Sequence, residues 1–380
     1  SSFSTINYNN YYVSGSQGVL GYLTSDRTNL AGIVTGFGGN ANSLNSSTSF
    51  VSVSNGHINT ASADNLCLNG AGATLASITE DIDGDTRNAT TPDMGADEFD
   101  PTALVVTNQT VCTPSTVDLT ATSVTTGSAT GLTYTYFTDA AASSALSTPT
   151  AVSTSGTYYI KASNASGCSM ISPVVVTINT SPAPSVSGSG SVCASSTGNV
   201  YSVTNNTGNT YSWTVTGGTI TAGSGTNSIT VTWGSSGAGD VSVTETVTAT
   251  GCNTTATKNV TINANPTPSI TGSSSGCALI DGNSYSVTNV AGNTYSWTVT
   301  GGTVSSGSNT NSITVAWGAA GTKTVSVTQT VTATGCSTSA SATVTVIESP
   351  TATSAVIEPT TCASENGQIN LTLGGAAGPY

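Results

Sequence analysis

Charged residues are scarce in this 380-residue sequence, and basic ones are the scarcest. Five Lys and Arg stand against 18 Asp and Glu, which gives a formal net charge of −13. The cations are spread singly along the chain, as Arg27, Arg87, Lys161, Lys258 and Lys323. Because nucleic-acid binding requires a clustered basic surface, the sequence excludes nucleic acid as a partner.

The residues that catalytic and membrane-spanning motifs require are also missing. His57 is the single histidine, and no acid lies near it in the sequence. We therefore expect a surface or stacked histidine and not a member of a catalytic triad. The sequence contains no phosphate-binding loop, no zinc-type Cys/His cluster and no apolar run long enough to span a membrane. We expect neither enzymatic activity nor a membrane span in this segment.

Helical periodicity is missing as well. Val, Ile, Tyr and Trp alternate with Thr and Ser at a period of two over long stretches. This alternation is typical of β-strands, and the β-branched residues favour them further. The sequence therefore predicts an all-β fold whose polar surface consists mainly of hydroxyl and amide groups.

The clearest positive feature is an internal repeat in the second half of the chain. TYSWTVTGGT at 210–219 is copied at 294–303, and NSITVTWG at 227–234 returns as NSITVAWG at 311–318. Four landmark residues of the first copy recur in the second at one constant offset, so that Cys193, Trp213, Trp233 and Cys252 become Cys277, Trp297, Trp317 and Cys336. A repeat of this length predicts an array of small independent domains.

The tryptophans of the repeat fall on the inner face of their predicted strands. They alternate with Thr and Ser and share a face with neighbouring Tyr, Ile and Val residues. We interpret Trp213, Trp233, Trp297 and Trp317 as core residues; the alternative is an aromatic platform for carbohydrate. Glu245 falls on the same inner face, and we expect a strand edge or a bulge there.

The placement of the cysteines predicts an oxidising compartment. Six of the eight form pairs of nearly equal spacing, one pair per predicted module: Cys112–Cys168, Cys193–Cys252 and Cys277–Cys336. We expect a disulfide within each module, worth about 4 kcal/mol in the chain-entropy treatment; the alternative is buried free thiols. We expect Cys67 to be a buried free thiol and Cys362 to pair with a residue that follows this sequence.

Residues 1–100 differ from the rest in being rich in Gly, Asn and Ser. Short β runs at 31–37, 49–54 and 74–79 are separated by turn-forming residues, a pattern that fits the rungs of a parallel β-helix. Eight of the 18 acids then lie within residues 80–100. The segment DIDGDTRNATTPDMGADEF at 81–99 resembles the closing motif of secreted bacterial right-handed β-helix proteins.

This resemblance implies a cap in which Arg87 pairs with Asp97 or Glu98 over the last rung. The alternative is an irregular Ca²⁺ site, because Asp81, Asp83 and Asp85 alternate as in calcium-binding loops. An EF-hand is excluded, since position 12 of such a loop would be Pro92 and not Glu. We expect no cofactor, with Ca²⁺ as the one candidate.

The remaining chain resembles modules found in large secreted proteins of Bacteroidota. Residues 102–180 resemble an Ig-like module, in which SGTYY leads into a tyrosine-corner strand at Tyr158. Residues 185–264 and 269–347 resemble PKD-like repeats, and short proline-containing linkers precede each. Residues 348–380 resemble the start of the SprB-type repeat of gliding-motility adhesins.

Together these resemblances imply the end of a β-helix over residues 1–100, followed by a tandem array of β-sandwiches. The implied function is that of a stalk segment in a very large cell-surface adhesin or filament, secreted across the outer membrane by the type IX pathway and serving gliding motility. Its partners would be further domains of the same chain, surface polysaccharide or the gliding machinery. The alternative is the C-terminal tail of a secreted β-helix enzyme that degrades polysaccharide.

Overall fold

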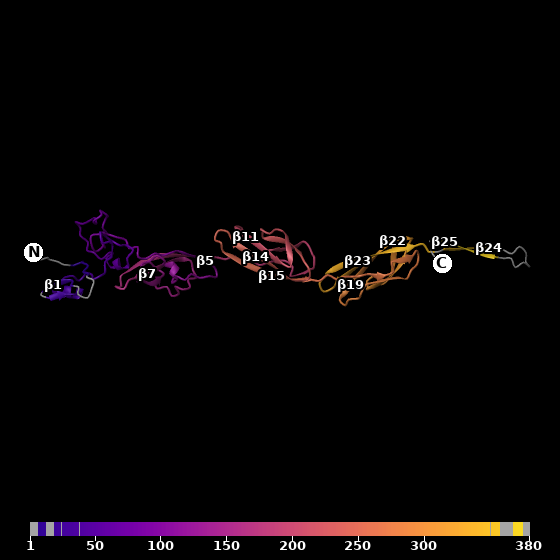
Figure 1. Ribbon diagram of the computed structural model, residues 1–380, viewed down its shortest axis with the longest axis horizontal. Coiled ribbons are helices and arrows are strands. Elements are labelled where there is room, and N and C mark those ends of the chain that lie inside the picture. The colour runs from indigo at the N-terminus through magenta and orange to yellow at the C-terminus, as the bar shows by residue number, and fades with distance from the viewer. Residues whose placement is uncertain are drawn as a thin grey trace, which may run out of the picture. The chain divides into compact units, whose positions relative to one another are not determined.

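The computed structural model describes residues 7–12, 19–23, 25–37, 39–349, 351–357 and 368–374. With 45% strand and 4% helix, the chain is all-β, as the sequence predicted. It divides into two compact units, Ser1–Ser181 and Pro182–Tyr380. In Figure 1 the colour follows the chain, so that β1 (Gly21–Leu23) lies in the indigo part near the N-terminus and β25 (Gln368–Gly374) in the yellow part near the C-terminus.

The described part of residues 7–100 consists mainly of loops with short secondary structure. Two antiparallel hairpins, one α-helix and one 3-10 helix are present: β1 (Gly21–Leu23) with β2 (Ser25–Arg27), β3 (Phe50–Ser52) with β4 (Asn55–Ile58), α1 (Leu30–Phe37) and η1 (Ala63–Cys67). The run at 31–37 is therefore helical and not a strand. Asn29 explains this locally, because its side-chain oxygen accepts the Gly32 amide and caps the first turn.

A β-helix is not shown among the described residues, where the parallel strand contact is an isolated bridge between Asn10 and Leu44. Asparagine side chains nevertheless join successive loops. Asn10 donates to the Ser46 carbonyl and accepts the Ser46 amide, both at 2.9 Å. Asn65 forms the same pair of bonds with Ser49, at 2.6 and 2.8 Å. The loops thus stack through amide groups over a small apolar core of Leu68, Met94 and Phe99.

The module that follows contains one four-stranded sheet in the order β5-β8-β7-β6. Its strands are β5 (Gln109–Cys112), β6 (Thr133–Phe137), β7 (Gly156–Ser163) and β8 (Ser169–Asn179), with β5 parallel to β8 and the other pairs antiparallel. Loops, among them the 3-10 helix η2 (Thr122–Val124), cover its inner face. The hydroxyl of Tyr158 donates to the Thr154 carbonyl at 3.0 Å, so the tyrosine corner expected from SGTYY is present.

The first repeat module is a sandwich of two sheets, in the orders β10-β13-β12 and β11-β14-β15-β9. The strands are β9 (Ser191–Cys193), β10 (Asn199–Ser202), β11 (Asn209–Thr216), β12 (Gly218–Ala222), β13 (Ser228–Trp233), β14 (Gly237–Val247) and β15 (Asn253–Asn263). Strand β9 is parallel to β15, and the other pairs are antiparallel.

The second repeat module has the same topology with one strand added, β16, in the sheets β16-β18-β21-β20 and β17-β23-β22-β19. In the first module an isolated bridge between Ser187 and Ser202 stands in place of β16. Its strands are β16 (Thr271–Gly272), β17 (Ser275–Cys277), β18 (Asn283–Ser286), β19 (Asn293–Thr300), β20 (Gly302–Ser306), β21 (Ser312–Trp317), β22 (Gly321–Val331) and β23 (Ser337–Ile347). A hairpin of β24 (Thr351–Ile357) and β25 (Gln368–Gly374) follows.

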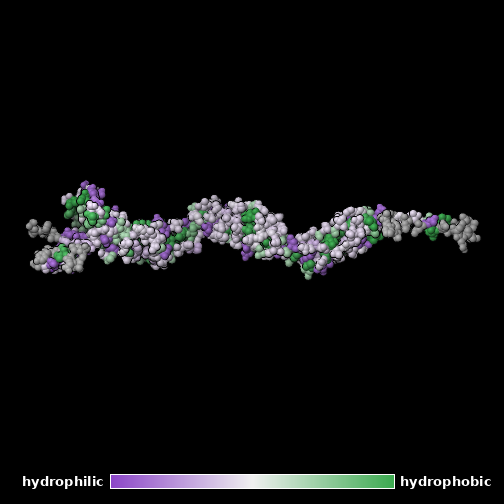
Figure 2. Space-filling view, in the orientation of Figure 1, coloured by the Kyte–Doolittle hydropathy of each residue, from purple (hydrophilic) through white to green (hydrophobic). Residues whose placement is uncertain are grey.

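The alternating pattern decides which side chains fill the repeat cores. Trp213 and Trp233 are 7% and 2% exposed, and their counterparts Trp297 and Trp317 match them. Tyr201 meets Trp233 edge to face, with ring centroids 5.9 Å apart. The Thr and Ser residues between them face outward, and the visible faces of both modules in Figure 2 are correspondingly pale.

The expectation of an edge or a bulge at Glu245 is wrong. Glu245 lies inside the sheet, opposite Tyr211 on β11 and Thr254 on β15, and its side chain is fully buried. Asn206 and Asn209 each donate a side-chain N–H to its Oε1, at 2.7 and 2.6 Å. These two amides satisfy one oxygen of the buried carboxyl group, while Oε2 has no hydrogen-bond partner among the described residues.

Candidate functional site

The two cysteines of each module lie at opposite ends of the sandwich. In the first repeat module, Cys193 ends β9 and lies opposite Asn263, the last residue of β15, whereas Cys252 directly precedes β15. The 11 residues of β15 separate the two positions, which is about 37 Å in an extended strand. A disulfide requires Cα atoms less than about 7 Å apart. These two cysteines therefore cannot pair within their module.

The other two modules repeat this arrangement. Cys112 lies opposite Asn179 at the end of β8, and Cys168 directly precedes that strand. Cys277 lies opposite Ile347 at the end of β23, and Cys336 directly precedes it. The chain leaves each module beside the first cysteine, and we therefore call that end of the module the exit pole. The opposite end, which carries the second cysteine, is called the entry pole.

The disulfides join different parts of the chain. Cys67 bonds to Cys168, with Cα atoms 5.1 Å apart, and Cys193 bonds to Cys336, with Cα atoms 5.5 Å apart. The expected pairs Cys112–Cys168, Cys193–Cys252 and Cys277–Cys336 are therefore wrong, as is the free thiol expected at Cys67. Cys112 and Cys252 are also disulfide-bonded. Cys277 has a free thiol among the described cysteines, and Cys362 lies outside the described residues.

The Cys193–Cys336 bond runs from the exit pole of one repeat module to the entry pole of the next. Neighbouring modules are thus linked by the backbone and, in addition, by a covalent bond between side chains. Cys336 has no exposed surface, which protects the bond from reductants. The Cys67–Cys168 and Cys193–Cys336 bonds therefore each join different modules and do not lie inside one core.

A second candidate site lies in the acidic segment 80–100. Arg87 points at this segment: its Nε lies 3.5 Å from Glu98 Oε2, and its other nitrogens donate to the carbonyls of Asp93 and Gly95 at 2.5 and 2.9 Å. The structure thus pairs Arg87 with Glu98, whereas Asp97 faces His57. Arg87 ties together the backbone of residues 93–98.

Asp81 organises the same segment through backbone amides. Its Oδ1 accepts the amides of Asp83 and Asp85, both at 2.9 Å, and its Oδ2 accepts the amide of Glu98 at 3.0 Å. The hydrogen bond from Glu98 is the main cause of a lowered pKa for Asp81. Both carboxylate oxygens are therefore engaged by the chain itself, and Asp81, Asp83 and Asp85 do not form a common ligand set among the described residues.

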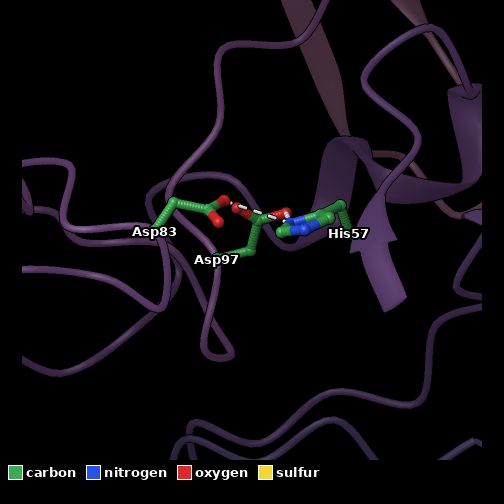
Figure 3. A group of neighbouring side chains, drawn as sticks. All are labelled: His57, Asp83 and Asp97. Atoms are coloured by element: carbon green, nitrogen blue, oxygen red, sulfur yellow. Dashed lines mark ion pairs between the residues drawn. The ribbon is translucent and has the colours of Figure 1, made fainter. Parts of the chain in front are cut away.

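The structure instead gathers His57, Asp83 and Asp97 (Figure 3). His57 Nδ1 lies 3.1 Å from Asp83 Oδ2 and 3.8 Å from Asp97 Oδ2. His57 and Asp97 also line an open cavity of about 500 Å³. An imidazole and two carboxylates could hold a divalent cation or accept and donate protons.

Two features of this region escaped sequence reasoning. The acids beside His57 are distant from it in the sequence, so searching near the histidine missed them. Asp93 is 4% exposed and accepts the amides of Gly70 and Phe99, at 2.6 and 2.7 Å. Burial is the main cause of a raised pKa for Asp93. The one sequence feature that could have drawn attention to Asp93 is its position in the PDMGADE segment.

Comparison with known domain families supports the modular reading of the fold. Residues 179–262 and 263–346 each match the PKD-like domain family, and residues 101–182 match the family described as Ig-like domain CHU_C associated. The chain is an array of β-sandwich domains. More particularly, it is an Ig/PKD repeat protein. No curated protein matches the sequence.

Solved structures of several adhesion and muscle proteins show a weak likeness. The N-terminal eight Ig domains of Down syndrome cell adhesion molecule match with a TM-score of 0.35 and 11% identity, over 69% of this chain and 39% of that one. The protocadherin gammaB4 extracellular domain matches with a TM-score of 0.24 and 11% identity, over 68% of this chain and about half (51%) of that one. An I-band fragment of titin matches with a TM-score of 0.27 and 10% identity, over 58% and 89%. At these TM-scores the likenesses carry no argument about function.

The environment of the protein follows from its covalent chemistry. Disulfides persist in oxidising compartments, so the bonds at the module junctions indicate an extracellular protein. Within the residues that the structure describes, no helix is long and apolar enough to cross a membrane.

Proposed function

We propose that this chain is a stalk segment of a large secreted cell-surface adhesin. The observation that carries the proposal is the Cys193–Cys336 bond between the exit pole of one module and the entry pole of the next. A protein that only needed stable domains would gain a similar stability from a bond inside each module. A bond across a junction adds resistance to separation of the domains, which a stalk under tension requires.

The strand arrangement gives a second line of resistance. In each repeat module a strand near the start of the module is parallel to its last strand, as in β9 with β15 and β17 with β23. Strands β15 and β17 lie inside the loop that the Cys193–Cys336 bond closes, so the intact bond keeps tension between the chain ends off both pairs. Once the bond is reduced, pulling slides these parallel neighbours past each other, and their hydrogen bonds must break together and not one by one.

The finer parts of the proposal rest on sequence resemblance. The closing motif at 81–99 and the amide-linked stacking of loops around Asn10 and Asn65 support the end of a right-handed β-helix over residues 1–100. The start of an SprB-type repeat at 348–380 supports a gliding-motility adhesin exported by the type IX pathway. The proposed partners are further domains of the same chain, together with surface polysaccharide or the gliding machinery.

The proposal includes no enzymatic activity, and one alternative has a specific observation in its favour. The cavity that His57 and Asp97 line could bind a ligand, which favours the tail of a secreted β-helix enzyme acting on polysaccharide. Turnover of a polysaccharide by the purified chain, abolished in a His57→Ala variant, would establish this alternative.

The test of the stalk proposal is the size and location of the native polypeptide. We expect a very long chain on a denaturing agarose gel, with antibodies against residues 185–347 binding intact cells. Treatment of the cells with external protease should remove this signal while a cytoplasmic marker protein stays intact. A short released protein that leaves the cell surface unlabelled would refute the stalk.

A further inference from the structure

We propose that Cys277 forms a disulfide with a cysteine at the entry pole of a further β-sandwich module, which follows residues 269–347 on the same polypeptide. The inference depends on the disulfide pattern of the modules and not on the adhesin role. The proposed bond would join the second repeat module to the module after it, as the Cys193–Cys336 bond joins the two repeat modules.

The internal repeat supplies the first argument. Cys277 ends β17 and lies opposite the last residue of β23, in the same register as Cys193 at the end of β9. Cys193 is bonded to the entry pole of the module that follows it, and Cys112 at the exit pole of the preceding module is also disulfide-bonded. Among the cysteines the structure describes, Cys277 alone has a free thiol. Cys112 and Cys193 are thus both in disulfides. Cys277 has the same place in its module, opposite the last residue of the last strand.

The second argument is the path by which the chain leaves each module. In every module one side chain of the linker donates to the carbonyl of the residue after the first cysteine. Ser181 Oγ donates to Thr113, Asn265 Nδ2 donates to Ala194 at 2.9 Å, and Ser349 Oγ donates to Ala278. A proline follows each donor in the sequence. The chain therefore leaves the second repeat module along the same path as it leaves the two modules whose exit-pole cysteine is bonded.

The surface around Cys277 gives the third argument. Leu279 is 81% exposed, Ile280 is 50% exposed, and Ile347, opposite Cys277, is 47% exposed. Their counterparts in the first repeat module are the polar residues Ser195, Ser196 and Asn263. Three exposed aliphatic side chains around a thiol suit the apolar contact of a docked module, since their burial is favourable at about 25 cal/mol per Å².

The sequence spacing identifies which cysteine of the next module would take part. The exit-pole cysteines Cys112, Cys193 and Cys277 follow one another at nearly equal intervals, and Cys362 comes after Cys277 at almost the same interval. The spacing alone predicts that Cys362, which lies outside the described residues, is another exit-pole cysteine. The entry-pole cysteines Cys168, Cys252 and Cys336 recur with the same regularity. The partner of Cys277 is therefore expected one further repeat length after Cys336, directly before the last strand of its module.

Formation of the bond needs an oxidant. The two thiols lose two protons and two electrons as the S–S bond forms. An oxidised protein disulfide, acting by thiol–disulfide exchange, accepts them and is reduced to its dithiol.

The first experiment uses the full 380-residue chain in a Cys362→Ser variant. Alkylation in denaturant without reductant, followed by peptide mapping, should label a single thiol, at Cys277. In the unsubstituted chain Cys277 and Cys362 should both be labelled, and recovery of a Cys277–Cys362 peptide would overturn the proposal.

The second experiment supplies the missing partner. In an extended chain, a further copy of residues 264–347 follows Ile347 directly. In that copy Cys277→Ser removes the second exit-pole thiol, and Ser337→Ala marks the peptide that carries Cys336 by mass. We expect Cys277 to lose its reactivity and to be recovered in a peptide joined to the Cys336 position of the added copy. In the matched control, Cys336→Ser in the added copy alone, Cys277 should become labelled again.

Tryptophan fluorescence of both extended chains shows whether the added copy has folded. A folded copy that leaves Cys277 as a labelled thiol would refute the proposal, as would a bond between Cys277 residues of two chains. The same mapping on the native polypeptide should find Cys277 joined to a cysteine located after Tyr380.

Discussion

Reduction of the disulfides should greatly increase the length to which this chain can be pulled. The Cys67–Cys168 and Cys193–Cys336 bonds span sequence separations of 101 and 143 residues. An extended residue contributes about 3.4 Å, so the two bonds withhold about 340 Å and about 490 Å of chain from tension. We expect the fully unfolded reduced chain to be about 830 Å longer than the oxidised one.

The assay is single-molecule force extension with handles at the two chain ends, with and without reductant. Cys277→Ser is the matched control, because it removes a thiol that holds no disulfide among the described cysteines and should leave both lengths unchanged. Loss of the Cys193–Cys336 bond should also cost about 5 kcal/mol in the chain-entropy treatment. An oxidised chain that extends as far as the reduced one would refute the pairing between modules and the stalk mechanism with it.

Three further predictions concern individual side chains. Glu245→Leu should lower the free energy of unfolding by about 1–3 kcal/mol in urea denaturation, because two amide donors lose their acceptor, whereas Glu245→Gln should retain most of it. Trp233→Ala should cost about 3–5 kcal/mol, measured in the same way, since it leaves a cavity in the core. The pKa of Asp81 is lowered in the folded state, so its contribution to stability is present above its ordinary value of 3.8 and lost as the pH falls through the folded pKa. Hydrogen exchange of the Glu98 amide, corrected for intrinsic rates, should therefore lose protection below that pH, and unchanged protection would contradict the role of Asp81.

The strand pattern could be predicted because it is local. Alternation of Thr with Trp, Tyr and Val specifies which face of a strand is buried, whatever the partner strand is. The tyrosine corner at Tyr158 was found for the same reason, since its hydroxyl bonds to nearby Thr154. Where tertiary context decided the outcome, the prediction failed. Glu245 fits an inner strand only because Asn206 and Asn209 reach it from a neighbouring loop and strand.

The candidate sites depended on contacts across long sequence separations. The carboxylates of Asp83 and Asp97 reach His57 only through the folding of the loops between them. Likewise, the alternation of Asp81, Asp83 and Asp85 suggested a ligand set, but Asp81 is engaged by backbone amides of its own segment. Residue spacing alone does not report where a side chain points.

The sequence by itself determined the number of repeat modules, their period and the β-structure of the chain, because these follow from local alternation and from copied segments. Only the tertiary structure decided how the cysteines pair. In the sequence, Cys193 and Cys252 look like the two ends of one closed loop. The strand that follows Cys252 places it about 37 Å from Cys193, at the opposite end of the sandwich. Cys193 instead bonds to Cys336, which the adjoining module presents, so the direction of the last strand leads to a covalent junction between the two repeat modules.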